Sequence, residues 1–95
     1  MSEEPEKQPL SVYDFLMAMI DQAAGLAWQK LGLQPDFVTG KIAPDFAEAR
    51  VAIDLVAKLS AMIDEKLDDS DRREMQNLVS NLRLNYVEKT KTTSG

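Results

Sequence analysis

The sequence predicts an all-α protein, a small three-helix fold in which a helical hairpin is completed by a third, capping helix. Three observations support this fold class. Apolar residues recur at three- and four-residue spacing in three separate segments, as they do along one face of an α-helix. A residue type that commonly caps helices stands at the start of each segment. The four prolines, which interrupt helices, all lie outside these segments.

A chain of 95 residues suits a single domain, which we expect to cover residues 11–88. Residues 1–10 are charged, contain two prolines and have few large apolar side chains, so they are expected to form a disordered leader. Residues 89–95 are polar and are expected to form a flexible tail.

The first helix is predicted over residues 11–31. Ser11 can accept a hydrogen bond from the first turn, and Asp14 completes a pattern that resembles a capping box. Gly32 follows the last apolar residue and suits the left-handed conformation that ends many helices.

The second helix is predicted over residues 45–67, with Asp45 as its cap and Glu48 three residues later. The connector before it, residues 33–44, has turn-forming residues at Pro35-Asp36 and Thr39-Gly40. A short hairpin that pairs residues 37–38 with residues 41–42 is one alternative, although so short a strand pair is not stable by itself. The structure of this connector is left open.

The third helix is predicted over residues 70–87. Ser70 is the expected cap, and Asp71 beside it suits the positive end of the helix dipole.

The first two helices are apolar over more of their circumference than a surface helix needs. At 100° per residue, the apolar residues of each span an arc of about 220°, whereas a stripe of about 100° is usual. The third helix has a stripe of the usual width. It cannot cover both wide faces, so we expect a homodimer that forms through the first two helices.

The outer edges of the two wide arcs are the candidate dimer interface. Each of these residues is equally compatible with a place in the core of one chain. Ala18 and Gly25 are small enough to permit a close helix crossing, and Gly25 is equally compatible with a tolerated weak spot of the helix that costs about 1 kcal/mol. The candidate interface residues are Tyr13, Met17, Trp28, Val51, Leu55 and Met62.

The composition gives no support for an enzyme. The chain has no cysteine and no histidine, so it lacks the usual zinc ligands, the commonest general base and the thiol nucleophile. Asp21 and Asp64 stand in similar LxAMID-like contexts, but their surroundings follow ordinary helix periodicity and predict solvated carboxylates. The acidic residues between 64 and 74 lack the spacing of a calcium loop. We therefore expect no catalytic residues, no metal and no cofactor.

The charge of −5 also limits the partners. A nucleic-acid binder needs clustered basic residues, whereas Arg72-Arg73 is the only adjacent pair in this chain. No stretch has the roughly 20 uninterrupted apolar residues of a membrane-spanning helix. We expect a cytoplasmic protein that binds no nucleic acid and has no membrane span, and its acidic surface disfavours anionic membrane leaflets.

Several short motifs occur in an order and spacing that resemble a known bacterial family. They are Leu31-Gly32, a loop with Pro35, Thr39 and Gly40, a helix with Ala49 and Ile53-Asp54-Leu55, and Leu82-Arg83 followed by Tyr86-Val87-Glu88. The family is catalogued as domain of unknown function 1844, and the resemblance covers roughly residues 12–88. The chain departs from the family at residues 65–70. The resemblance implies a small helical bacterial protein and supplies no activity or ligand.

The expected function is that of an uncharacterised, non-enzymatic interaction module that self-associates, with room for an unknown protein partner in a remaining apolar groove. The alternative is a carrier or sensor of a small apolar ligand or lipid, with its pocket between the first two helices. The five methionines suit an adaptable pocket lining of this kind.

Overall fold

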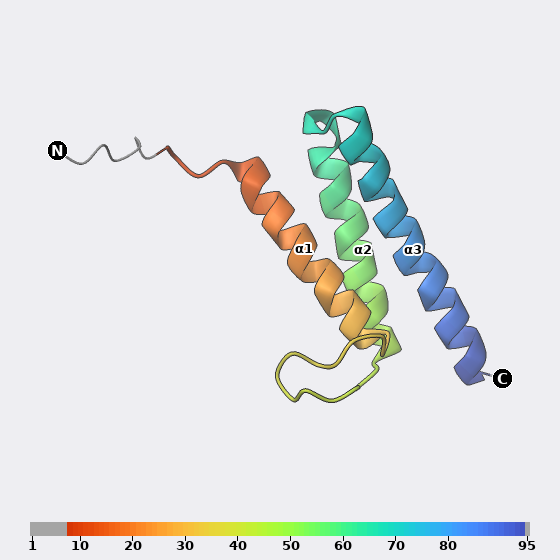
Figure 1. Cartoon of the computed structure of the whole chain (residues 1–95). Helices are drawn as coiled ribbons and strands as arrows, with labels where there is room; N and C mark the ends of the chain where they lie inside the picture. The colour runs from red at the N-terminus through yellow and green to blue at the C-terminus, as the bar shows by residue number, and fades with distance from the viewer. Residues whose placement is uncertain (1–7, 95) are drawn as a thin grey trace.

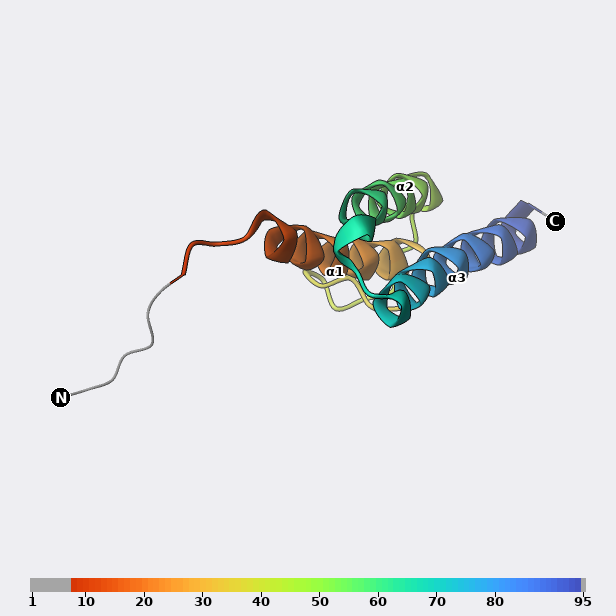
Figure 2. The same ribbon diagram turned by 90° about the horizontal axis from the view of Figure 1, so that it is seen from above.

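The computed structural model describes residues 8–94, with side chains up to Lys91. It contains α1 (Val12–Lys30), α2 (Phe46–Ile63), a short 3₁₀ helix η1 (Asp64–Lys66) and α3 (Asp69–Ser94). No β-strand occurs within the described residues. Helices α1 and α2 form an antiparallel hairpin, and α3 runs back along α2 (Figure 1). Seen from above, the three helices do not lie in one plane (Figure 2). The predicted all-α, three-helix architecture is confirmed. Residues 1–7 of the predicted leader lie outside the described residues.

The predicted start and end of the first helix are both confirmed by hydrogen bonds. The backbone N–H of Tyr13 donates to the hydroxyl of Ser11 over 3.2 Å. At the other end Gly32 has φ +80°, the left-handed conformation that favours glycine. Its N–H donates to the carbonyl of Gln29, and the next N–H, that of Leu33, donates to the carbonyl of Trp28. This pair of bonds is a Schellman motif, which satisfies carbonyls that the helix end would leave unpaired.

Replacing Gly32 with alanine is expected to lower the free energy of unfolding by about 1–2 kcal/mol, because an L side chain strains the left-handed backbone. An added Cβ would also lie 3.2 Å from Cβ of Pro44, which is a tight contact. Gly25→Ala is the matched control, since a Cβ there meets nothing within 4 Å. In a helix interior this exchange should stabilise by up to about 1 kcal/mol. Urea denaturation at equal protein concentration measures the free energy of unfolding of both variants and the parent. Equal stability of Gly32→Ala and the parent would contradict the left-handed helix end at Gly32.

The connector between α1 and α2 forms a closed turn without strands. The N–H of Asp36 donates to the carbonyl of Lys41, and the N–H of Gly40 donates to the carbonyl of Asp36, each over 2.8 Å. The short hairpin considered from the sequence is therefore not formed. The predicted cap of α2 is confirmed, because the carboxylate of Asp45 accepts the N–H of Glu48 over 3.1 Å.

The carboxylate of Asp36 holds this turn together. It accepts the N–H of Val38 over 2.8 Å and that of Thr39 over 2.9 Å. These bonds, first that of Thr39 and then that of Val38, lower the pKa of Asp36 from its usual value of 3.8. A carboxyl group whose pKa is lower in the folded than in the unfolded state stabilises the folded protein at pH values above its unfolded-state pKa. This stabilisation is lost as the pH falls through the folded-state pKa.

We therefore expect Asp36→Asn to lose less stability than the parent on acidification below about pH 4, because one proton-linked contribution is missing. Thermal melting followed by circular dichroism over a series of acidic buffers measures this. Parallel acid profiles for the two proteins would show that the turn does not depend on the charged form of Asp36.

The third helix differs from the prediction at both ends. Its cap is Asp68, whose carboxylate accepts the N–H of Asp71 over 2.8 Å, so Ser70 lies inside the first turn and the prediction of Ser70 as the cap is wrong. The helix continues to residue 94 instead of ending at residue 87 before a flexible tail. Residues 88–94 contain no proline or glycine, and the hydroxyl of Thr90 donates to the carbonyl of Tyr86 one turn back.

The turn between α2 and α3 is fastened by Arg72. Its guanidinium donates to the carbonyls of Asp64 and Leu67, each over 3.1 Å. It also lies 3.3 Å from the carboxylate of Asp64 and 3.1 Å from that of Asp69. Asp64 is thus part of an ion pair and is not the freely solvated carboxylate expected from the sequence.

The core lies mainly between α1 and α2. Ala23, Ala27 and Ala49 are buried in it, whereas Ala18 is exposed and the space around Gly25 is open. Within one chain, Ala18 and Gly25 therefore do not form the contact between α1 and α2. Among the described residues, two of the buried apolar residues come from α3. The buried residues are Leu16, Ile20, Ala23, Ala24, Ala27, Leu31, Ala49, Ile53, Val56, Leu59, Ile63, Val79 and Leu82.

Candidate functional site

The face of the α1–α2 hairpin that is turned away from α3 carries large apolar side chains in contact with solvent. We call it the open face. Its six residues are between 42% and 67% exposed. They are Val12, Phe15 and Leu26 on α1 and Val51, Leu55 and Met62 on α2.

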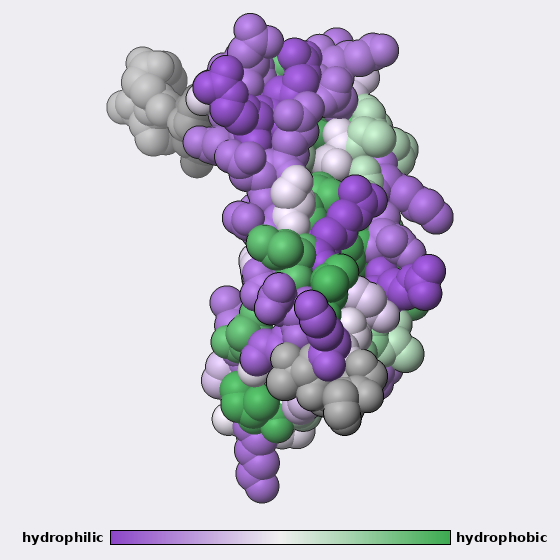
Figure 3. Space-filling view, turned by 90° about the vertical axis from the view of Figure 1, so that its right-hand side faces the viewer, coloured by the Kyte–Doolittle hydropathy of each residue, from purple (hydrophilic) through white to green (hydrophobic). Residues whose placement is uncertain are grey.

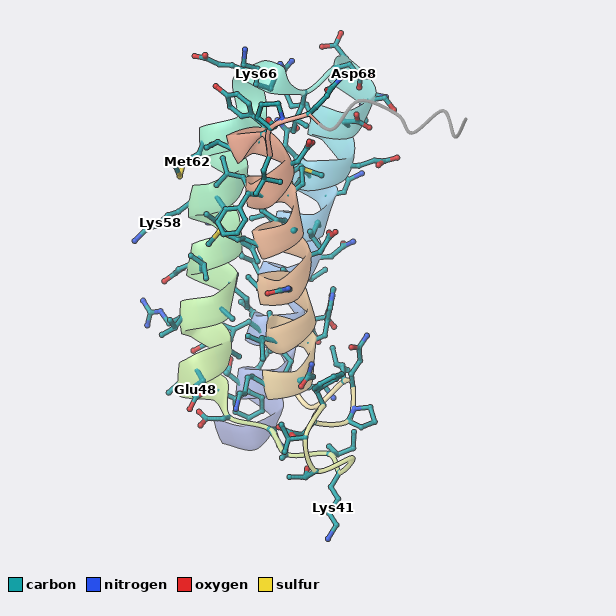
Figure 4. All side chains as sticks on the ribbon, turned by 90° about the vertical axis from the view of Figure 1, so that its left-hand side faces the viewer. Lys41, Glu48, Lys58, Met62, Lys66 and Asp68 are labelled. Atoms are coloured by element: carbon teal, nitrogen blue, oxygen red, sulfur yellow. The ribbon has the colours of Figure 1, made fainter. Side chains whose placement is uncertain are left out.

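Helix geometry places these six side chains on one surface. Leu26, Val51 and Leu55 line the same hollow of about 370 Å³ between the two helices. At 100° per residue, Val12 and Phe15 fall within about 40° of Leu26 around α1, and Met62 falls within about 20° of Leu55 around α2. Figure 4 views the hairpin with α3 behind it and shows Met62 projecting from the edge of α2. The exposed apolar surface therefore runs along both helices.

Charged contacts lie at both ends of the hairpin, and the one near the connector joins its two helices. Near the connector, Nζ of Lys30 on α1 lies 3.2 Å from Oε1 of Glu48 on α2. The Glu48 carboxylate raises the pKa of Lys30, by its hydrogen bond and by its charge. At the opposite end, Nζ of Lys66 lies 5.1 Å from the ring centroid of Tyr13, within the range of a cation–π contact. An apolar centre with a polar rim is the usual composition of a protein–protein interface.

The structure brings together only half of the predicted interface residues. Val51, Leu55 and Met62 lie on the open face, whereas Tyr13, in the first turn of α1, contacts Lys66. Trp28 is half-buried against the core. Met17 is also half-buried and lines a separate hollow with residues Leu67, Met75 and Leu78, on the side of α1 that faces α3.

The sequence reasoning missed Val12, Phe15 and Leu26, although all three belong to the wide apolar arc of the first helix. A usable signal was present, because these residues and Met19 crowd into a sector of about 60°. Which edge of the apolar arc stays exposed depends on the side of α1 against which α3 packs. The helical periodicity does not contain that information.

The described residues contain no group of three acidic side chains placed to hold a metal ion. Asp21 is exposed, and the carboxylate of Asp64 is paired with Arg72, so these two aspartates do not form the desolvated pair that shares a proton. Within the described part of the chain, no helix combines the length and the apolar character needed to cross a membrane.

A family model described as "Domain of unknown function (DUF1844)" matches residues 12–88. The match includes α1, α2, most of α3 and every residue of the open face. Comparisons with curated proteins and with solved structures gave no match.

Proposed function

The chain belongs to the DUF1844 family, and we propose that it is a non-enzymatic interaction module that forms a homodimer through its open face. The family description names no activity, so the proposal rests on the shape of the hairpin. The observation that supports this most directly is the run of six exposed apolar side chains along two neighbouring helices. Soluble monomers rarely keep so large a contiguous apolar patch in water. In the dimer, each open face covers the other, and four helices share one core with α3 on the outside.

The size of the open face fits a second copy of the chain. An α2 of 18 residues is about 27 Å long, and α1 has 19 residues. Two such helices side by side present a face of roughly 27 by 20 Å. Because projecting side chains make the accessible area larger than this flat rectangle, the accessible area of the face approaches the value of about 800 Å² per partner that is common in stable complexes.

The charges along α2 favour an antiparallel arrangement of the two copies. Glu48 stands near the start of the helix and Lys58 nearer its end, as Figure 4 shows. A two-fold axis across the helices brings Glu48 of one copy toward Lys58 of the other. The Glu48 side chain is 62% exposed despite its contact with Lys30, so it remains accessible for this second pairing.

Light scattering coupled to size-exclusion chromatography tests the proposal on the whole chain. At micromolar concentration we expect the mass of two chains, and dilution should shift the mass toward one chain in a reversible manner. A single-chain mass that persists to millimolar concentration would refute the dimer.

The second candidate function, a carrier of a small apolar ligand or lipid, is favoured by one observation. The hollow of about 370 Å³ on the open face has a mainly apolar lining that includes Ala23, Leu26, Val51 and Leu55. A ligand there would take the place of the second copy. Native mass spectrometry separates the two candidates, because a carrier gives one chain plus a bound small molecule, whereas the dimer gives two chains and nothing else.

A further inference from the structure

A different recess lies between α2 and α3, on the side of α2 that faces α3. It has a volume of about 330 Å³. We call it the arginine cleft, and its lining residues are Arg50, Ile53, Asp54, Arg83, Tyr86 and Val87. Ile53 is buried and Tyr86 is half-buried, so the floor of the cleft is apolar. Figure 3 views the α3 side of the molecule and shows apolar surface exposed between hydrophilic side chains.

The two arginines of this cleft are not used by the fold. Arg50 on α2 and Arg83 on α3 are both exposed, and neither forms a salt bridge with another residue of the described chain. Arg72 is the contrasting case, since its guanidinium is paired with two carboxylates and two carbonyls. Asp54 is the one acidic residue in the lining, so two cations face one anion in a protein whose net charge is −5.

We propose that the arginine cleft binds a small monocarboxylate that carries a short apolar tail. A guanidinium presents parallel N–H donors that match a carboxylate, and Arg50 and Arg83 approach the cleft from two different helices. The apolar floor formed by Ile53, Tyr86 and Val87 would cover the tail. Ligand pockets usually measure about 300–1,000 Å³, so a cleft at the lower limit selects a small molecule.

This site does not depend on the proposed dimer. The arginine cleft lies on the α3 side of α2, whereas the open face lies on the side away from α3. A failure of one proposal therefore leaves the other unaffected.

Nuclear magnetic resonance titration of the whole chain tests the site with three probes. Hexanoate carries both the carboxylate and the tail, acetate lacks the tail, and hexanamide lacks the charge. We expect saturable shifts of the Tyr86 and Val87 amide signals with hexanoate, and at least about tenfold weaker binding of the other two probes. Absence of saturation with hexanoate would overturn the proposal, and so would equal binding of hexanoate and either control probe.

Variants of the cleft test the electrostatic contribution with opposite signs. Arg50→Gln and Arg83→Gln should each weaken hexanoate binding by about tenfold, because each removes a charge-assisted contact. Asp54→Asn should strengthen binding, because it removes the one repelling carboxylate. Arg73→Gln removes the same charge from α3 outside the cleft lining and should leave binding unchanged. Equal effects of Arg83→Gln and Arg73→Gln would show that only net charge matters and would overturn the site.

Discussion

Leu55→Glu is expected to convert the proposed dimer into a monomer that remains folded. Leu55 lines the hollow of the open face near the middle of α2, and it is 42% exposed in one chain, so a glutamate there can reach water when the chain is monomeric. In the two-fold dimer the same change buries two unpaired carboxylates close together. We expect dimer affinity to fall by at least about a hundredfold, which corresponds to roughly 3 kcal/mol.

Sedimentation velocity over a concentration series measures this effect, and circular dichroism verifies that the variant keeps its helices. Leu84→Glu is the matched control, because Leu84 is 61% exposed on α3 and does not belong to the open face. It should retain the two-chain mass. If Leu55→Glu sediments as the parent does, or if Leu84→Glu dissociates to the same extent, the open face is not the dimer interface.

The features that the sequence predicted correctly are those determined by neighbouring residues. The roles of Ser11, Asp45 and Gly32 follow from hydrogen bonds and backbone angles within one turn of each residue. Ser70 was chosen wrongly because Asp68, two residues earlier, is also a good cap. The pattern of local propensities does not distinguish between two acceptors so close together.

The features that the sequence could not predict depend on how the helices are arranged in space. The 220° arc of the first helix correctly indicated a surplus of apolar surface, but α3 covers the edge with Met17 and leaves the edge with Phe15 exposed. The arginine cleft has the same origin, since Arg50 and Arg83 are 33 positions apart and meet only because α3 runs back along α2. Helical periodicity places residues on a face of one helix and does not say which helix will lie opposite.

Leu82→Ala is expected to cause the largest loss of stability among these substitutions. Leu82 is completely buried, and among the described side chains of α3 only Leu82 and Val79 belong to the buried core. Truncating a buried leucine to alanine usually costs about 2–5 kcal/mol. Since α3 is attached by so narrow a stripe, we expect it to detach before the α1–α2 hairpin unfolds. A polar helix that is no longer packed is only marginally stable in water, so much of its helicity should be lost with it.

Hydrogen exchange measured residue by residue distinguishes this detachment from general unfolding. In Leu82→Ala, amides of α3 should exchange much faster than those around Ala27 and Ala49, which are completely buried in α1 and α2. Leu84→Ala, at an exposed position of the same helix, should change stability by less than about 0.5 kcal/mol. Equal acceleration in all three helices of Leu82→Ala would mean that α3 is an integral part of one cooperative core. The proposed dimer would then depend on α3 as much as on the open face, because the hairpin could not present that face without it.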